Sequence, residues 1–163
     1  MYSKGHSGLT LLLVSLLMLP FGENQNALII IVLSAGLSAL PDIDMELRKK
    51  VGFIHHRGVT HSILFAIVSG LVLGGLFFYT HNTLMWAGIG FLSAFFGVVS
   101  HLIGDSFTYH AFKPLWPFSD REVHLGICRA SDKSVNEGLM TAGGIALIAY
   151  YLITTGSIKS FLP

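Results

Sequence analysis

The stretch SILFAIVSGLVLGGLFFYTHNTLMWAGIGFLSAFFGVVSHLIG, residues 62–104, contains no Asp, Glu, Lys or Arg. A helix that crosses the hydrocarbon core of a bilayer needs about 20 predominantly apolar residues. This stretch is long enough for two such helices, and THNT at residues 80–83 supplies a turn between them. We therefore expect two consecutive membrane spans, over about residues 62–80 and 83–105.

The composition of the whole chain agrees with membrane insertion. Hydrophobic residues make up 52% of the 163 residues, charged residues only 12%, and the mean hydropathy is +0.66. Soluble domains carry about 25% charged residues, which disfavours a soluble protein with unusually buried helices. Three further runs without charge cover residues 5–22, 24–41 and 138–158. We predict an all-α, polytopic membrane helical bundle, because isolated strands cannot satisfy their backbone in lipid.

We expect five membrane spans in one integral membrane domain, residues 1–163. The spans are placed at about residues 7–21, 26–41, 62–80, 83–105 and 138–155, with a long loop at 106–137. The first two are short and are joined by PFGEN, so they should form a tight hairpin or lie in a thinned bilayer. A signal peptide is the alternative for the first span, but no small-x-small cleavage site follows it.

Two simpler features limit the kinds of site and partner. The single cysteine, Cys128, cannot form an internal disulfide, and it cannot supply the cysteine ligands of a zinc ribbon or finger. The net charge of +1 argues neither for nor against nucleic acid. No phosphate-binding glycine loop or nucleophile elbow is present either, and we expect no nucleic-acid partner.

Basic residues lie almost entirely on one side of the five predicted spans. Nine of the ten Lys and Arg residues fall on the side of the N-terminus, and only Lys159 falls on the other. By the positive-inside rule, the N-terminus and both large loops should be cytoplasmic and the C-terminus outside. We therefore predict an integral protein of the plasma (inner) membrane. The nine residues are Lys4, Arg48, Lys49, Lys50, Arg57, Lys113, Arg121, Arg129 and Lys133.

Most histidines and several aspartates fall at the same predicted membrane edge. Because successive spans alternate in direction, residues before the first and third spans meet residues at the ends of the second and fourth. These residues are His6, Asp42 and Asp44 in LPDID, His55, His56 and His61 in HHRGVTHS, and His101 and Asp105 in SHLIGD. Glu23 and His81 fall at the opposite edge. Ionisable residues at a membrane are functional candidates by default, so this convergence predicts a site.

The spacing within two of these motifs suggests how the side chains could act. His101 and Asp105 are four residues apart, so on a helix they share one face and could ligate one ion or bracket two. The alternative is a polar helix end that faces water. Asp42 and Asp44 would point the same way in an extended segment and could bridge metals, or they could be turn-forming aspartates.

The segment HHRGVTHS precedes the third span. We expect Thr60 to cap that helix through its hydroxyl. Solvated interfacial histidines that merely start a helix are the alternative, which explains one histidine better than three. Only one of two adjacent side chains can face inward in a regular segment, and spacing does not distinguish His55 from His56.

The long loop carries further polar and aromatic residues. FKPLWPF, residues 112–118, is typical of an interfacial segment with Trp116 at headgroup depth. Loops of this length in a compact domain are usually functional or disordered. The roles of His110 and His124 stay open, because the sequence does not say whether the loop reaches the site.

Five motifs taken together resemble a known family. KGH, LPDID, HRGVTHS, SHLIGDSFT and PLWPF, in this order and spacing, resemble the YdjM-like family of membrane-bound metal-dependent hydrolases. That family is distantly similar to zinc-dependent phospholipase C and the P1-type nucleases, and its motifs cover most of this chain, from Gly5 to the start of the fifth span. The resemblance favours His56 over His55. It implies metal ligation by His6, Asp42, Asp44, His56, His61, His101 and Asp105.

This sequence departs from the family pattern at two points. Met45 stands where the family often has a histidine directly after LPDID, so that ligand is missing here. The segment TYHAFKPLWPF, residues 108–118, differs from the commoner version, which contains glycine. The first departure bears on the number of metal ligands and the second on contacts with the substrate.

The resemblance also implies an activity. Mixed imidazole and carboxylate ligands suit Zn²⁺, with Mn²⁺ as the alternative, better than Mg²⁺ or Cu⁺. Seven ligands exceed one tetrahedral ion, so we expect two ions or more, bridged by Asp42 or Asp44, and a two-metal hydroxide mechanism. Arg57 would contact a phosphoryl group, and Glu137 would be a weaker ligand or a supporting catalytic residue.

The predicted depth of the site suggests its substrate. A metal site at headgroup level favours a phosphoester of a membrane lipid, so we expect a membrane-embedded, phospholipase-like hydrolase whose partners are the bilayer and its lipid substrate. The alternative is a metal-binding transport or scaffold protein without hydrolase activity. Ligands at one edge argue against transport, because transporter sites usually lie near the midplane. The sequence indicates neither the lipid nor the oligomeric state.

Overall fold

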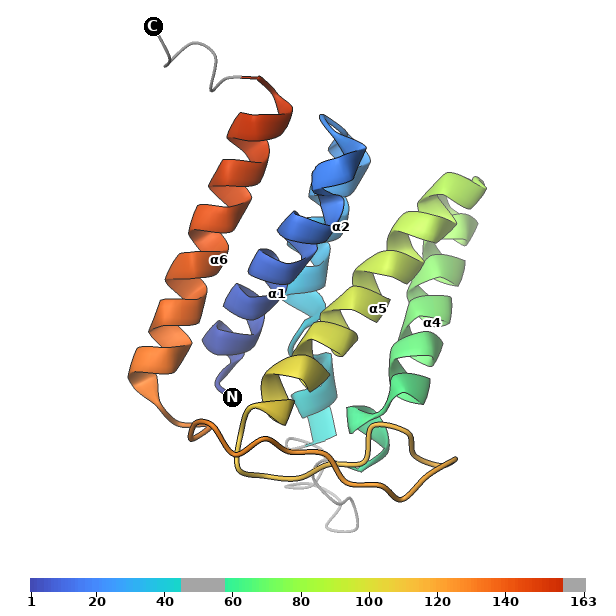
Figure 1. Cartoon of the computed structure of the whole chain (residues 1–163). Helices are drawn as coiled ribbons and strands as arrows, with labels where there is room; N and C mark the ends of the chain where they lie inside the picture. Colours follow the sequence, from blue (N-terminus) through green and yellow to red (C-terminus); the bar gives the residue numbers. More distant parts are fainter. Residues whose placement is uncertain (45–57, 157–163) are drawn as a thin grey trace, which may run out of the picture.

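The structure is a computed structural model that describes residues 1–44 and 58–156. Within these ranges the regular secondary structure is all helical, with two isolated backbone bridges and no strand. The long helices are α1 (Ser3–Met18), α2 (Gln25–Leu37), α4 (Ile63–His81), α5 (Leu84–Ser106) and α6 (Lys133–Thr154). They lie side by side in one bundle, with their ends at two opposite faces (Figure 1). The predicted all-α membrane fold is confirmed.

Five segments of the described chain are long and apolar enough to cross a membrane. They are Ser3–Phe21, Gln25–Asp42, Ile63–His81, Leu84–Ser106 and Lys133–Thr154. The first two extend past α1 and α2 through proline-containing 3₁₀ turns, which end at Phe21 and Asp42. The first and fifth begin several residues earlier than predicted, because the small and polar residues at their starts pack against neighbouring helices. The predicted number of spans is confirmed.

The central helix of the bundle is α5. It packs against α4, α2 and α1, and α1 in turn packs against α6. In Figure 1 the order from left to right is α6, α1, α5 and α4, with α2 behind α1. Within the apolar windows, 56% of α5 is buried, against 17% of α4 and 11% of α6. Buried polar side chains can therefore be carried by α5, whereas α4 and α6 present most of their surface to lipid.

Two glycines allow α1 and α6 to approach closely. A Cβ at Gly8 would overlap the backbone of Leu139 and Met140, and a Cβ at Gly143 would overlap the backbone of Gly8. Small residues commonly bring membrane helices together, because apolar side chains gain little by leaving lipid. The contact fixes the height of α1 against α6, and with it the height of His6 in the first turns of α1.

The segment 107–132 crosses the end of the bundle at which α1 begins and α5 ends (Figure 1). Its backbone pairs with itself through a bridge between Phe112 and Val123. It also pairs with α4, because Ile63 donates its N–H to the carbonyl of Pro114 at 2.8 Å. The Phe112 side chain is buried. The segment therefore covers the end of the bundle where the predicted site lies.

Side-chain caps fix where α4 and α6 begin. The hydroxyl of Ser62 accepts the N–H of Phe65 at 3.1 Å, so Ser62 is the cap of α4 and the prediction of Thr60 was wrong. The reason is a 3₁₀ turn that includes Thr60 and delays the start of the helix. Asp132 accepts the N–H of Val135 at 3.2 Å and starts α6 before the predicted residue.

Candidate metal centre

Six of the seven predicted metal ligands come together at one end of the bundle. His6 comes from α1, Asp42 and Asp44 follow α2, His61 precedes α4, and His101 and Asp105 lie in the last turns of α5. All three imidazoles are fully buried, and two of the three carboxylates are almost as buried. Only the side chain of Asp42 reaches the surface, with 23% exposed. The seventh predicted ligand, His56, lies outside the described residues, as do His55 and Arg57.

His61 and His101 face each other through equivalent ring nitrogens. Their Nε2 atoms are 3.3 Å apart, and the two rings are nearly perpendicular. The other nitrogen of each ring already has an oxygen partner: His101 Nδ1 donates to the carbonyl of Ser38 at 2.7 Å, and His61 Nδ1 lies 3.1 Å from the Thr60 hydroxyl. Histidines that bind metals use this arrangement, in which one nitrogen is held and the other faces the ion.

Asp105 connects two parts of the cluster through its two oxygens. Its Oδ1 lies 3.4 Å from His6 Nε2. Its Oδ2 lies 3.5 Å from His61 Nε2 and 3.7 Å from His101 Nε2. The last distance is the contact between residues four apart on α5 that the SHLIGD motif predicts. One carboxylate is therefore shared between His6 on one side and the His61–His101 pair on the other.

Asp42 and Asp44 approach opposite nitrogens of one imidazole. Asp42 Oδ1 lies 3.8 Å from His61 Nε2, whereas Asp44 Oδ2 lies 3.4 Å from His61 Nδ1. Of the two alternatives for LPDID, the turn is confirmed and the extended segment is wrong, because Leu40–Asp42 forms a 3₁₀ turn and the chain stays helical at Asp44. The two carboxylates thus do different things: one joins the ring nitrogen that faces the cluster, and the other holds the opposite nitrogen together with Thr60, whose hydroxyl donates to it at 2.8 Å.

His6 is stacked on His101 at the back of the cluster. The ring centroids are 3.7 Å apart and the planes are nearly parallel. A Cβ at Gly104 would come within 3.0 Å of His6 Nδ1, so only glycine leaves room for the ring against α5. Among the described residues, this buried nitrogen has no hydrogen-bond partner. Nε2 is therefore the nitrogen of His6 that faces the polar groups of the cluster.

A positively charged nitrogen already lies in the cluster. The α-amino group of Met1 is 2.9 Å from His6 Nε2 and 2.8 Å from Asp105 Oδ1. Buried carboxylates are stable only when a cation or several donors accompany them. His6 Nε2 and Asp105 Oδ1 thus face the same space, which is one test of whether a metal ion fits these residues.

The distances around the histidine pair suit a single tetrahedral ion. Asp42 Oδ1 and Asp105 Oδ2 each lie 3.5–3.8 Å from both imidazole Nε2 atoms, which are themselves 3.3 Å apart. Bonds of about 2.0–2.1 Å to a tetrahedral zinc place its ligand atoms about 3.4 Å from one another. Donor atoms of His61, His101 and Asp105 all lie within 4.8 Å of one another, and so do those of His6, Asp42 and His101. These residues could hold a metal ion.

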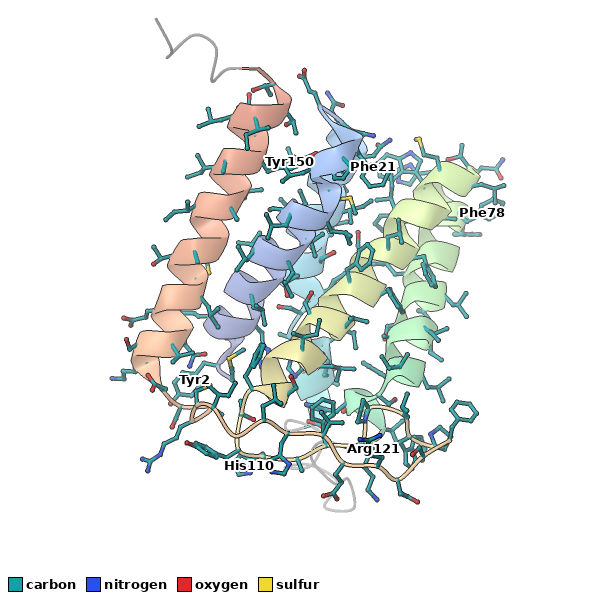
Figure 2. All side chains as sticks on the ribbon, viewed as in Figure 1. Tyr2, Phe21, Phe78, His110, Arg121 and Tyr150 are labelled. Atoms are coloured by element: carbon teal, nitrogen blue, oxygen red, sulfur yellow. The ribbon has the colours of Figure 1, made fainter. Side chains whose placement is uncertain are left out.

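The other predicted residues lie apart from this cluster. Glu137 is exposed on α6, and His110 and His124 are exposed on the segment 107–132. Figure 2 shows His110 and Arg121 on that segment at the site end of the bundle. His81 and Glu23 lie at the opposite end, as predicted. None of these residues belongs to the groups that could hold an ion.

Three supporting residues were not predicted in these roles. Ser38 contributes only its carbonyl, a group that every residue carries, so no sequence signal could identify it. Thr60 directly precedes His61 within HRGVTHS, and this position could have indicated a contact between the Thr60 hydroxyl and the His61 ring. Asn136 is buried where Gly5 leaves room for it, and it accepts the N–H of Tyr2 at 2.9 Å. An amide in the first turn of an apolar helix is the only hint that the sequence gives of this last contact.

The comparisons with known proteins agree with this description. A family model described as YdjM inner membrane protein matches residues 1–161 of the chain. No curated protein and no solved structure matches it significantly.

Proposed function

The chain belongs to the YdjM inner membrane protein family, and we propose that it is a metal-dependent hydrolase that cleaves a phosphoester of a membrane lipid. The observation that carries this proposal is the pair of facing imidazole nitrogens, 3.3 Å apart, with two carboxylate oxygens 3.5–3.8 Å from both. Imidazole and carboxylate donors suit Zn²⁺ or Mn²⁺. A buried set of this kind at a membrane edge is expected to serve chemistry rather than topology.

Each described residue takes a role from its contacts. His61, His101 and Asp42 would hold one ion, and His6 would hold a second. Asp105 would bridge the two through its two oxygens, in place of the bridging expected of Asp42 or Asp44. Arg57, outside the described residues, is proposed to contact the phosphoryl group, where a guanidinium can bind two oxygens.

Supporting residues would keep the ligands in place. Asp44 and Thr60 would fix the ring of His61 through Nδ1, and the Ser38 carbonyl would fix His101. Partners of this kind set the tautomer of a metal-bound imidazole and are worth about 10–100-fold in metal affinity. Glu137, exposed on α6, would support the site only by moving toward it.

The reaction is a hydrolysis. When bound, divalent ions supply Lewis acidity and make a water molecule acidic enough to attack near neutral pH. Water would add to phosphorus, the bond from phosphorus to the lipid oxygen would break, and that oxygen would take up a proton. Asp42 is the candidate ligand nearest to an entering substrate, because it alone of the described set reaches the surface.

The experiment measures metal and turnover together. Purified protein in lipid nanodiscs should contain two ions of zinc or manganese per chain by mass spectrometry, and it should release phosphate or a phosphorylated headgroup from a phospholipid. His101→Ala should abolish both, and His6→Ala should lose one ion. His81→Ala is the matched control at the opposite end. Protein without metal, or unchanged turnover in His101→Ala, would contradict the proposal.

The orientation of the site is also proposed. Four basic residues lie at the site end of the bundle, which supports a cytoplasmic site under the positive-inside rule. They are Lys4 and Lys133 in the first turns of α1 and α6, and Lys113 and Arg121 in the segment 107–132. Cys128, the only cysteine, lies in the segment that crosses this end. A membrane-impermeant maleimide should label it in inside-out vesicles and not in intact cells. Labelling in intact cells would place the site outside.

Metal passage is a second candidate, and one observation favours it. The hydroxyls of Ser15, Ser34 and Ser93 are buried on α1, α2 and α5, and none has a hydrogen-bond partner among the described residues. Polar groups inside a membrane bundle often mark a path for ions. Uptake of Zn²⁺ or Mn²⁺ into vesicles, lost when Ser34 and Ser93 are replaced by alanine, would favour passage over hydrolysis.

A further inference from the structure

A pocket of about 490 Å³ lies directly beside the cluster of candidate metal ligands, between the start of α1 and the end of α2. Its walls include Tyr2, Gly36, Leu37, Leu40, Asp42 and Ile43. Figure 2 shows Tyr2 at the same end of the bundle as His110. Apart from Asp42, the walls are mainly apolar. The pocket is therefore a mainly apolar space with one carboxylate, that of Asp42, in its wall. Asp42 Oδ1 lies 3.7 Å from the Nε2 of His101.

The pocket is continuous with an exposed stripe of the second membrane-spanning segment, because Gly36, Ala39 and Ile43 belong to both. Val32, Gly36, Ala39 and Ile43 are all exposed, and their spacing puts them on one side of the α2 segment. This stripe runs along the second membrane-spanning segment, Gln25–Asp42, and ends at the pocket. In a bilayer its neighbours are acyl chains. A lipid that slides along the stripe would bring its headgroup to Asp42.

Gly36 keeps the pocket open. A Cβ at Gly36 would have no atom of the described residues within 4 Å, so none of these residues fills the space beside it. A larger side chain at this position would project into the pocket.

A second groove on the other side of α2 provides a comparison. It measures about 350 Å³ and lies between α2 and α4, with Leu37 and Leu40 shared between the two. Its walls are apolar apart from Ser69, and no candidate metal ligand lines it. A bilayer lipid that filled this groove would contact none of the candidate metal ligands. The pocket beside Asp42 differs from this groove in having a candidate metal ligand in its apolar wall.

We propose that the pocket beside Asp42 is a lateral entry site for a lipid that carries a phosphate. The phosphate would lie at Asp42 and the cluster, the glycerol between Tyr2 and Leu37, and the first carbons of an acyl chain along Gly36. The volume is within the range of about 300–1,000 Å³ that small-molecule sites occupy, so the ends of the chains stay in the bilayer. The inference rests on the proposed function for the role of the phosphate.

The test uses photo-crosslinking, which requires no turnover. Full-length protein in nanodiscs is loaded with zinc and mixed with phosphatidic acid that carries a diazirine near the start of one acyl chain. Diacylglycerol with the same diazirine is the control probe, because it lacks the phosphate. Labelling of residues 36–43 should be about tenfold stronger with phosphatidic acid, the ratio that one charge-assisted contact supplies. Chelation of the metal should remove the difference.

Two glycine variants locate the effect. Gly36→Leu should reduce the labelling by phosphatidic acid to the level of diacylglycerol. Gly75→Leu is the matched control, because Gly75 is also helical and has no atom within 4 Å of a Cβ, but it lies on α4 away from the pocket. Equal labelling by both probes in the wild type would overturn the inference, even if Gly36→Leu failed to fold.

The outcomes separate this inference from the proposed function. Phosphate-dependent labelling without hydrolysis would support the lateral lipid site and contradict the hydrolase. Hydrolysis of a phospholipid with equal labelling by both probes would support the hydrolase and overturn the lateral site. Hydrolysis that Gly36→Leu abolishes for a long-chain phospholipid, but not for a short-chain soluble one, would support both.

Discussion

The two ends of the bundle both carry histidine, tryptophan and acidic residues, and they use them differently. At the site end, His61 and His101 are fully buried, and their Nε2 atoms lie 3.3 Å apart beside carboxylates. At the opposite end, His81 is exposed and stacks on Trp86 at 4.3 Å, and Glu23 lies in an exposed turn. His81 is the last residue of α4, where a positive charge is favourable to the helix dipole.

The difference shows what distinguishes a site from a polar membrane edge. Both ends have ionisable residues beside apolar helices, so the presence of such residues alone does not indicate chemistry. What separates them, among the described residues, is that histidines and aspartates from separate segments are buried together at the site end. Burial of histidines and aspartates needs a partner for every charge, and a metal ion would meet that need. The predictions below contrast matched positions in these two regions.

The largest expected effect is the loss of metal from His101→Ala compared with His81→Ala. Loss of a supporting residue alone weakens metal affinity by about 10–100-fold, so loss of a ligand should weaken it by about 100-fold or more. His81→Ala should leave affinity unchanged. Competition with a fluorescent zinc chelator measures both variants. Equal affinities would mean that the two ends do not differ in the way their burial indicates.

A smaller effect is expected for a residue that touches a ligand instead of the ion. Asp44→Asn keeps the shape of the side chain but removes the charge beside His61 Nδ1. Metal affinity should fall by about 10–100-fold, with the bound ions still present at saturating zinc. Asp120→Asn, an exposed carboxylate on the segment 107–132, should leave affinity unchanged. Loss of one whole ion in Asp44→Asn at saturation would instead make Asp44 a ligand.

Much of the site could be predicted because membrane topology alternates. Charge-free runs gave the number of spans, and a count of crossings placed His6, Asp42, His61 and His101 at one edge before any contact was known. The i, i+4 relation of His101 and Asp105 needs only helical geometry. These inferences succeeded because lipid leaves the backbone few choices.

What could not be predicted depends on local turns and on contacts between helices. The motif LPDID left a turn and an extended segment open, and neither alternative indicated that Asp42 and Asp44 would flank opposite nitrogens of one ring. The contact between Tyr2 and Asn136 exists because Gly5 leaves room for the amide. Such details follow from the relative height of two helices, which no periodicity in either helix reveals.

Adjacent glycines on α6 test how far the helix contacts hold the site. A Cβ at Gly143 would overlap the backbone of Gly8, whereas a Cβ at Gly144 would have no atom within 4 Å. Gly143→Ala should destabilise the protein by about 1–3 kcal/mol through overpacking. Gly144→Ala should be neutral or stabilise it by up to about 1 kcal/mol. Thermal unfolding in detergent measures both, and equal shifts would mean that α1 and α6 are not in close contact.

The smallest effect is expected for the ion pair between Lys113 and Asp120, 2.7 Å apart on the segment 107–132. The neighbouring ammonium lowers the pKa of Asp120, and the carboxylate raises the pKa of Lys113. The contribution of Asp120 to the stability of the fold is therefore complete above its ordinary pKa of 3.8, and it is lost as the pH falls through the lowered pKa. The contribution of Lys113 to stability is complete below its ordinary pKa of 10.5, and it is lost as the pH rises through the raised pKa.

Near neutral pH both contributions are thus complete, but both side chains are exposed, and solvent screens the pair. Lys113→Ala should leave the unfolding temperature and the metal affinity unchanged within error. The same melts as for the glycine variants, run near neutral pH and again in acid, measure this. A shift as large as that of Gly143→Ala would mean that this segment, and not the helix contacts alone, holds the cluster together.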